Sequence, residues 1–216
     1  NKSCIKWITG YQRTLQLKDR KLSRLFNTTL LFLLSLTLTT FNNMTHSYDR
    51  TNKWSILEYS KRLLNKTLEE AIIPNQIEEE FRGKGRLGQL VEKYFFGYDI
   101  NSNQEADFSE AGLELKCTPL KELATKALAI KERLVLTMID FSEDHKKPFE
   151  ESHVYIKCMF MLILFYLHEA GVPVQQLKFI YSVLWQIPEK DLLIMKQDYE
   201  TIIGKIKAGK AHELSE

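Results

Sequence analysis

The stretch EADFSEAGLELKCTPL, residues 105–120, decides how this chain folds and where its polar chemistry lies. Its second half alternates apolar and polar side chains, which predicts a β-strand over residues 112–120. Residues two apart in a strand point to the same side. Glu114 and Lys116 are therefore expected to project together from one face, while their leucine neighbours enter the other. A further acid, Asp107, stands seven residues upstream of Glu114.

An acid and a lysine that share a strand face can have two meanings. A solvent-exposed ion pair of this kind contributes about 0–1 kcal/mol and needs no function. Asp107, and Glu92 on the helix predicted just before, favour a metal-dependent site for phosphodiester hydrolysis. Mg²⁺ takes oxygen ligands, and its usual site combines one or two carboxylates with waters and a substrate phosphate. Asp107 and Glu114 could bind the cation, while Lys116 could hold the attacking water.

Asp, a loop of variable length and then Glu-x-Lys on a strand is the nuclease pattern called PD-(D/E)xK, which is loose by itself. Two further blocks make the resemblance more specific: GRLGQLVEKYFFG at residues 85–97 and FEESHVYIKCMFMLILFY at residues 149–166. Together with residues 105–120 they resemble the catalytic core of the mismatch-repair endonuclease MutH and of the GATC-cutting type II restriction endonucleases of the same family. The resemblance covers residues 83–166.

The resemblance implies a role for each matching residue. Asp107 and Glu114 would bind Mg²⁺, and Glu92, the acid of the Gly-x-x-x-Glu helix, would support the metal or the water. Lys116 would attend the nucleophilic water, and Lys157, in the Ser-His-x-x-x-Lys block, would lie near the scissile phosphate. The chain departs from the broader nuclease pattern in having alanine instead of proline before Asp107.

The rest of the chain predicts an α/β (α+β) fold, with a mixed β-sheet flanked by helices, as in restriction-endonuclease-like cores. Thr67 and Glu70 form a capping-box pattern at the start of a short helix. Helices are predicted over residues 54–64, 67–72, 86–97 and 188–210, and strands over residues 112–120, 133–141, 157–167 and 176–187.

Residues 1–43 differ in composition from the remainder and are left out of the fold prediction. A basic stretch precedes an apolar, threonine-rich run over residues 27–41, which is shorter than the roughly 20 apolar residues of a membrane span. We interpret residues 1–43 as a non-native or upstream segment, disordered or a stray hydrophobic helix, with Met44 as the natural start. A targeting or membrane segment is the alternative.

Residues 44–216 are interpreted as an N-terminal catalytic endonuclease domain that is truncated at its C-terminal end. The base-reading elements of the relatives lie largely C-terminal to the catalytic core. We therefore expect the 216-residue chain to cut DNA weakly or not at all, and a longer chain to cut.

Composition sets broad limits on the class of protein. Hydrophobic residues make up 44% and charged residues 27% of the chain, which is ordinary for a soluble globular domain. The formal net charge of +2 does not by itself indicate a nucleic-acid binder. The three cysteines lack zinc-ligand spacing and favour a reducing compartment, so we expect a cytoplasmic prokaryotic protein with no stable membrane partner.

Three other side chains are candidates for contacts with DNA. Lys84 and Arg86 flank a predicted helix start and could meet phosphates, or could belong to a solvated connector. His153 lies in the Ser-His-x-x-x-Lys block and could contact DNA, although a structural hydrogen bond is the more ordinary role.

The sequence thus predicts an Mg²⁺-dependent, sequence-specific endonuclease for double-stranded DNA. The resemblance implies a type II restriction enzyme that recognises GATC and leaves 5′-phosphates, with dimerisation or a second domain available for cutting both strands. One alternative is a MutH-like enzyme that nicks hemimethylated GATC in mismatch repair. The other is a non-catalytic DNA-binding or membrane-tethered protein.

Overall fold

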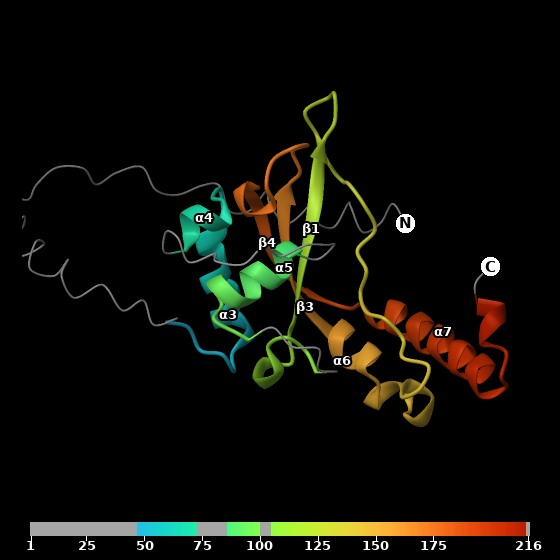
Figure 1. Ribbon diagram of the computed structural model, residues 1–216. Helices are drawn as coiled ribbons and strands as arrows, with labels where there is room; N and C mark the ends of the chain where they lie inside the picture. The colour runs from blue at the N-terminus through green and yellow to red at the C-terminus, as the bar shows by residue number, and fades with distance from the viewer. Residues whose placement is uncertain (1–46, 73–85, 100–104, 215–216) are drawn as a thin grey trace, which may run out of the picture. The chain divides into compact units, whose positions relative to one another are not determined.

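A mixed sheet in the strand order β2-β1-β3-β4 forms the centre of the structure (Figure 1). The structure is a computed structural model that describes residues 47–72, 86–99 and 105–214, all within one unit, His46–Glu216. β1 and β3 are parallel, whereas the β1–β2 and β3–β4 pairs are antiparallel. The predicted α+β fold with a mixed sheet flanked by helices is therefore confirmed. The strands are β1 (Glu114–Glu122), β2 (Leu128–Ile130), β3 (Phe160–Leu167) and β4 (Phe179–Gln186).

The helices lie on one side of this sheet and beyond one of its ends (Figure 1). Near the sheet are α3 (Lys53–Ser60), η2 (Lys61–Leu63), α4 (Leu68–Ala71), α5 (Arg86–Leu90) and the π-helical turn η3 (Val91–Phe95). Next to the strand starts are α6 (His153–Met159) and the long α7 (Glu189–Lys207). Short 3-10 turns complete the described elements: η4 (Ser109–Ala111), η5 (Asp144–Lys146), η6 (Phe149–Glu151), η7 (Val174–Gln176) and η8 (Ala211–Leu214).

β3 is almost entirely apolar because both of its faces are buried. Leu162 and Leu164 face the helices and join the main core, which also contains Leu115 of β1. Met161, Ile163 and Phe165 face the other way and form a second, smaller core. The main core also contains Phe179 of β4 and residues of the helices and turns: Ile56, Leu63, Leu68, Leu87, Leu90, Val91, Phe95, Phe96, Phe108, Ala111 and Leu113.

Local sequence signals explain several helix boundaries. The predicted capping box of α4 is confirmed, because the Glu70 N–H donates to Thr67 Oγ1 at 3.2 Å and the Thr67 N–H donates to Glu70 Oε2 at 2.8 Å. The predicted helix over residues 86–97 is present as α5 followed by η3. The helix predicted over residues 54–64 is present as α3 followed by η2, although Trp54 near its start is 67% exposed and does not join the core.

Two predicted strands need correction. Residues 131–140 form no regular structure, because only Leu134 and Leu136 of this apolar run pack against the sheet, and Val135 and Met138 face outward. Residues 157–159 belong to α6 and not to the following strand, because the backbone becomes extended only at Phe160. The Ser152 side chain caps the start of this helix by accepting the Tyr155 N–H. The predicted segment 1–43 and the connector that carries Lys84 lie outside the described residues.

Helices of the described part of the chain are all too short or too polar to cross a membrane. The longest of them, α7, packs its Tyr199 and Ile203 against Phe149 and Val154 in a third apolar cluster. This cluster joins α7 to the start of α6, and α6 leads directly into β3. The position of α6 relative to the sheet is therefore set by packing at both of its ends.

Candidate active site

Glu114, the first residue of β1, lies at the centre of a group of acidic and basic side chains. It is 3% exposed and pairs in register with Met161 of β3, on the face opposite the main core. Lys116 Nζ lies 2.8 Å from Glu114 Oε1, so the two side chains share one strand face as the alternation predicts. The burial of Glu114 makes this more than a solvent-exposed ion pair, because water screens it little.

A tight turn brings Asp107 next to Glu114 despite their separation in sequence. Phe108 and Leu113 form a β-bridge across η4, and Gly112 takes the left-handed conformation (φ 58°) that closes the turn. The Leu115 N–H donates to Asp107 Oδ2 at 2.8 Å, and the Asp107 N–H donates to Glu114 Oε2 at 3.3 Å. These reciprocal bonds fix the two carboxylates beside one another.

Glu92 approaches the same two acids from the π-helical turn η3. It is 9% exposed, and its pKa is raised from 4.5 to about 7, first by burial and then by the charges of Asp107 and Glu114. π-Helical turns inside helices are frequent at functional sites. The pKa of Asp107 is also raised, by burial and by the Glu114 charge. The three acids therefore form one electrostatically coupled group.

Lys157 of α6 supplies a second ammonium group to Glu114. Its Nζ lies 3.3 Å from Glu114 Oε2 and 3.5 Å from Oε1. Both oxygens of Glu114 consequently face a lysine, and the Lys157 charge also opposes the rise in the pKa of Glu92. The structure thus brings together all five residues that were predicted as catalytic.

The donor set suits a divalent cation that is held mainly by substrate and water. Within the described residues, no three histidine, cysteine or acidic side chains form a complete metal cage. A Mg²⁺ site needs only one or two carboxylates besides waters and phosphate oxygens. The raised pKa values of Glu92 and Asp107 reflect unfavourable negative charge, which a nearby cation would offset. Asp107 and Glu114 are the best-placed pair for this role.

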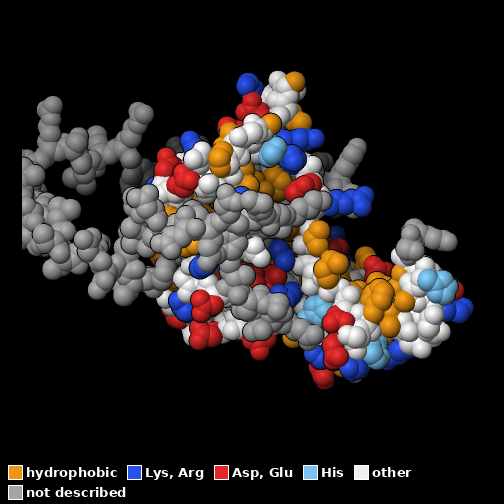
Figure 2. Space-filling view, viewed as in Figure 1, with side chains coloured by type: hydrophobic (Ala, Val, Ile, Leu, Met, Phe, Trp, Pro, Cys, Tyr) orange, Lys and Arg blue, Asp and Glu red, His pale blue; other side chains and the backbone are white. Residues whose placement is uncertain are grey.

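Of the predicted DNA-contact residues, His153 and Arg86 lie in the described part of the chain. His153 is 6% exposed and its ring nitrogens face Asp144 and the Met138 backbone, which is a structural environment. Arg86 begins α5 and is half-buried. Figure 2 shows acidic and basic side chains mixed on the visible face, in keeping with the net charge of +2. Asp144 was missed by the sequence reasoning, because nothing in its local pattern marks it.

Comparisons with known proteins agree with the geometry. Residues 96–198 match the family model described as DNA mismatch repair enzyme MutH. The chain is 36% identical over 137 residues to the type II restriction enzyme Sau3AI of Staphylococcus aureus, covering 62% of this chain and 28% of that enzyme. It is 32% identical over 134 residues to the DNA mismatch repair protein MutH of Shewanella amazonensis, covering 62% of this chain and 58% of that protein. The chain therefore spans only part of each relative's length.

Proposed function

We propose, on the premise that residues 96–198 of this chain belong to the MutH family of nucleases, that its group of acids and lysines hydrolyses phosphodiester bonds in double-stranded DNA. The resemblance expected from the sequence is confirmed by the family match. The observation that carries the proposal is the convergence of Asp107, Glu114 and Lys116 at the start of β1. Four of the five candidate catalytic residues lie within the matched segment, and Glu92 lies just before it.

Each side chain has a distinct role in this proposal. Asp107 and Glu114 would hold a divalent cation, which we infer to be Mg²⁺, with Glu92 in support. When bound, such a cation supplies charge neutralisation at the phosphate and activation of a water molecule. Lys116 would orient the attacking water, and Lys157 would stabilise negative charge on the scissile phosphate. Their partial burial strengthens both effects, because the surrounding dielectric is lower than that of water.

The specific activity that we propose is that of a type II restriction enzyme. The 36% identity to such an enzyme supports it, and the resemblance described above implies GATC as the recognition sequence and 5′-phosphate products. Cutting both strands requires two catalytic visits or two catalytic units, so dimerisation or a further domain is part of the proposal.

Plasmid cleavage tests the proposal. Unmethylated GATC plasmid is incubated with Mg²⁺ and an excess of protein, so that weak activity is measurable. Lys116→Ala is expected to lower the cleavage rate by about 100-fold or more, since charge stabilisation in the transition state is lost. Lys121→Ala, which changes an exposed lysine on the same strand, is the control and should cut like the unmodified chain. Equal cutting by Lys116→Ala would show that the site is misassigned.

A mismatch-repair nicking enzyme is the second candidate, and the family model that matches residues 96–198 favours it. On hemimethylated GATC plasmid such an enzyme would nick only the unmethylated strand, whereas a restriction enzyme would linearise the unmethylated plasmid. A third outcome, DNA retention without cleavage at any metal concentration, would support the non-catalytic alternative.

A further inference from the structure

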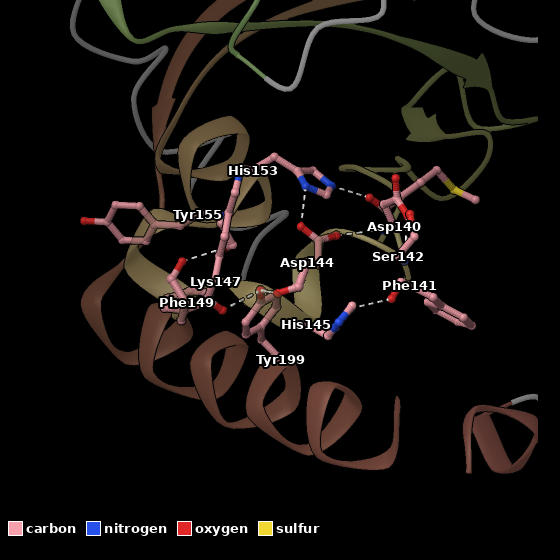
Figure 3. Close-up of polar contacts among 12 residues, drawn as sticks. Asp140, Phe141, Ser142, Asp144, His145, Lys147, Phe149, His153, Tyr155 and Tyr199 are labelled. Carbon is pink, nitrogen blue, oxygen red and sulfur yellow. Dashed lines mark hydrogen bonds and ion pairs between the residues drawn. The ribbon is translucent and has the colours of Figure 1, made fainter. Parts of the chain in front are cut away.

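A buried ion pair outside the site joins the start of α6 to the segment that precedes it (Figure 3). His153 Nδ1 lies 2.7 Å from Asp144 Oδ1, and the two side chains are 7% and 1% exposed. His153 Nε2 contacts the backbone oxygen of Met138. Asp144 Oδ2 accepts the Asp140 N–H at 2.7 Å, so this carboxylate is held from two sides. We call His153, Asp144 and the Met138 carbonyl the α6 anchor.

The contacts of the α6 anchor direct both ring nitrogens of His153 at protein oxygens. A backbone carbonyl and a carboxylate only accept hydrogen bonds, and each faces one ring nitrogen of His153. The imidazole ring is therefore held between two oxygens from the preceding segment, the Met138 carbonyl and the Asp144 carboxylate. Tyr199 of α7 adds a further tie, because its hydroxyl donates to the Asp144 carbonyl at 2.8 Å.

The α6 anchor lies one helical turn from a candidate catalytic lysine. α6 is only seven residues long, with His153 first and Lys157 fifth. Residues four apart lie on the same face of a helix. The rotation of α6 about its axis therefore sets the direction of both side chains at once. The His153 end is fixed by the α6 anchor, and Lys157 Nζ reaches both oxygens of Glu114.

We propose that His153 and Asp144 are positioning residues, which hold α6 at the rotation that places Lys157 Nζ against Glu114. This role rests on the proposed function, because it matters for catalysis only if Lys157 acts at the scissile phosphate. The pair itself does not touch substrate: His153 is 6% exposed, and both of its nitrogens are directed at protein oxygens. A 1 Å displacement of a catalytic group can lower the rate about 100-fold. A contact that fixes the position of α6 would therefore protect the rate by keeping Lys157 in place.

A double-mutant cycle on the 216-residue chain tests this proposal, with the single-turnover cleavage rate and the DNA dissociation constant as readouts. His153→Ala is expected to lower the rate by about 10-fold to 100-fold with little change in DNA binding. In the Lys157→Ala background the same change should cost less than about twofold, because the group it positions is gone. His145→Ala, which changes an exposed histidine whose ring contacts the Phe141 carbonyl, is the control and should cut normally. An equal loss in both backgrounds would overturn the proposal.

A second readout does not depend on nuclease activity. In ¹H–¹⁵N spectra of lysine ammonium groups, the Lys157 signal is assigned by its absence from Lys157→Ala. It should shift in His153→Ala in the same direction as in Glu114→Gln, since both lose the Lys157–Glu114 contact. Asp144→Asn should leave it near its original position, because an amide of the same shape can still form a hydrogen bond with Nδ1 of His153. If His153→Ala does not fold, His153→Gln replaces it with the same expected shift.

The two readouts separate the possible failures. Failure of both the 216-residue chain and a longer chain to cut GATC plasmid refutes the proposed function, while the Lys157 signal still reports on positioning. An unshifted Lys157 signal in a folded His153 variant refutes positioning, whatever the nuclease activity.

Discussion

The unusual titration of Glu92 gives a sharp test of the buried acid group. Its pKa is raised from 4.5 to about 7, because burial and the charges of Asp107 and Glu114 disfavour its ionised form. The folded chain therefore keeps a proton that the unfolded chain has already released in this pH range. As the pH rises through this window, the free energy of unfolding must fall. Glu92→Gln removes the ionisable group and should abolish this part of the decline.

The size of the effect follows from the shift. Each pH unit between the unfolded and folded pKa values changes the free energy of unfolding by about 1.4 kcal/mol. Between pH 4.5 and about 7 the contribution of Glu92 is at most roughly 3 kcal/mol. Asp107 acts in the same direction, because its pKa is also raised, so part of the decline with pH should remain in Glu92→Gln.

Urea denaturation in the presence of a chelator measures the prediction. The free energy of unfolding of the unmodified chain and of Glu92→Gln is compared at about pH 5 and about pH 8, with Trp185 of β4 as a fluorescent reporter in the second core. Glu92→Gln should gain up to roughly 3 kcal/mol relative to the unmodified chain between the two pH values. Glu169→Gln, which changes an exposed glutamate, is the control. Parallel pH profiles for Glu92→Gln and the unmodified chain would refute the reasoning.

Further predictions concern two glycines and one helix cap. Gly112→Ala should destabilise the chain by about 1 kcal/mol, because Gly112 has φ 58° although an added Cβ would meet open space. Gly204→Ala should stabilise it by roughly 0.5–1 kcal/mol, since Gly204 lies inside α7 with equally free space. Thermal unfolding of both variants checks the opposite signs. Thr67→Ala should cost about 1 kcal/mol by removing the α4 capping box, measured by urea denaturation, and Thr67→Ser should restore most of it.

The local part of the site could be predicted from the sequence because a strand has a fixed period. Alternation over residues 112–120 places Glu114 and Lys116 on one face, and their 2.8 Å contact confirms it. The turn that returns Asp107 to Glu114 depends on a left-handed residue, and Gly112 supplies it within the same short stretch. These are short-range effects, which sequence patterns report well.

The errors arise where tertiary packing decides the structure. The apolar run over residues 133–141 looks like a buried strand, yet it gains its burial through Leu134 and Leu136 without pairing with a neighbour. The boundary between α6 and β3 lies inside a continuous apolar stretch, where composition is the same on both sides. A period-based argument has no means of locating such a boundary.

Contacts between residues far apart in the sequence could be predicted only from the family resemblance, or could not be predicted. Lys157 contacts Glu114 across 43 residues, and no spacing rule connects them. The pairing of His153 with Asp144 depends on the path of the irregular segment between β2 and α6, which the sequence wrongly suggests is a strand. The rule that buried charges need partners becomes useful only once burial is known.

Calorimetric titration with Mn²⁺, as a divalent probe at about pH 8, tests most directly whether Asp107 and Glu114 share a cation. The unmodified chain should bind the ion, and Asp107→Asn should weaken this binding by at least about 10-fold, since it removes a charged ligand. Glu110→Gln, an exposed acid in the same turn, should bind as the unmodified chain does. Unchanged Mn²⁺ affinity in Asp107→Asn would contradict the assignment of these carboxylates and, with it, the proposed nuclease site.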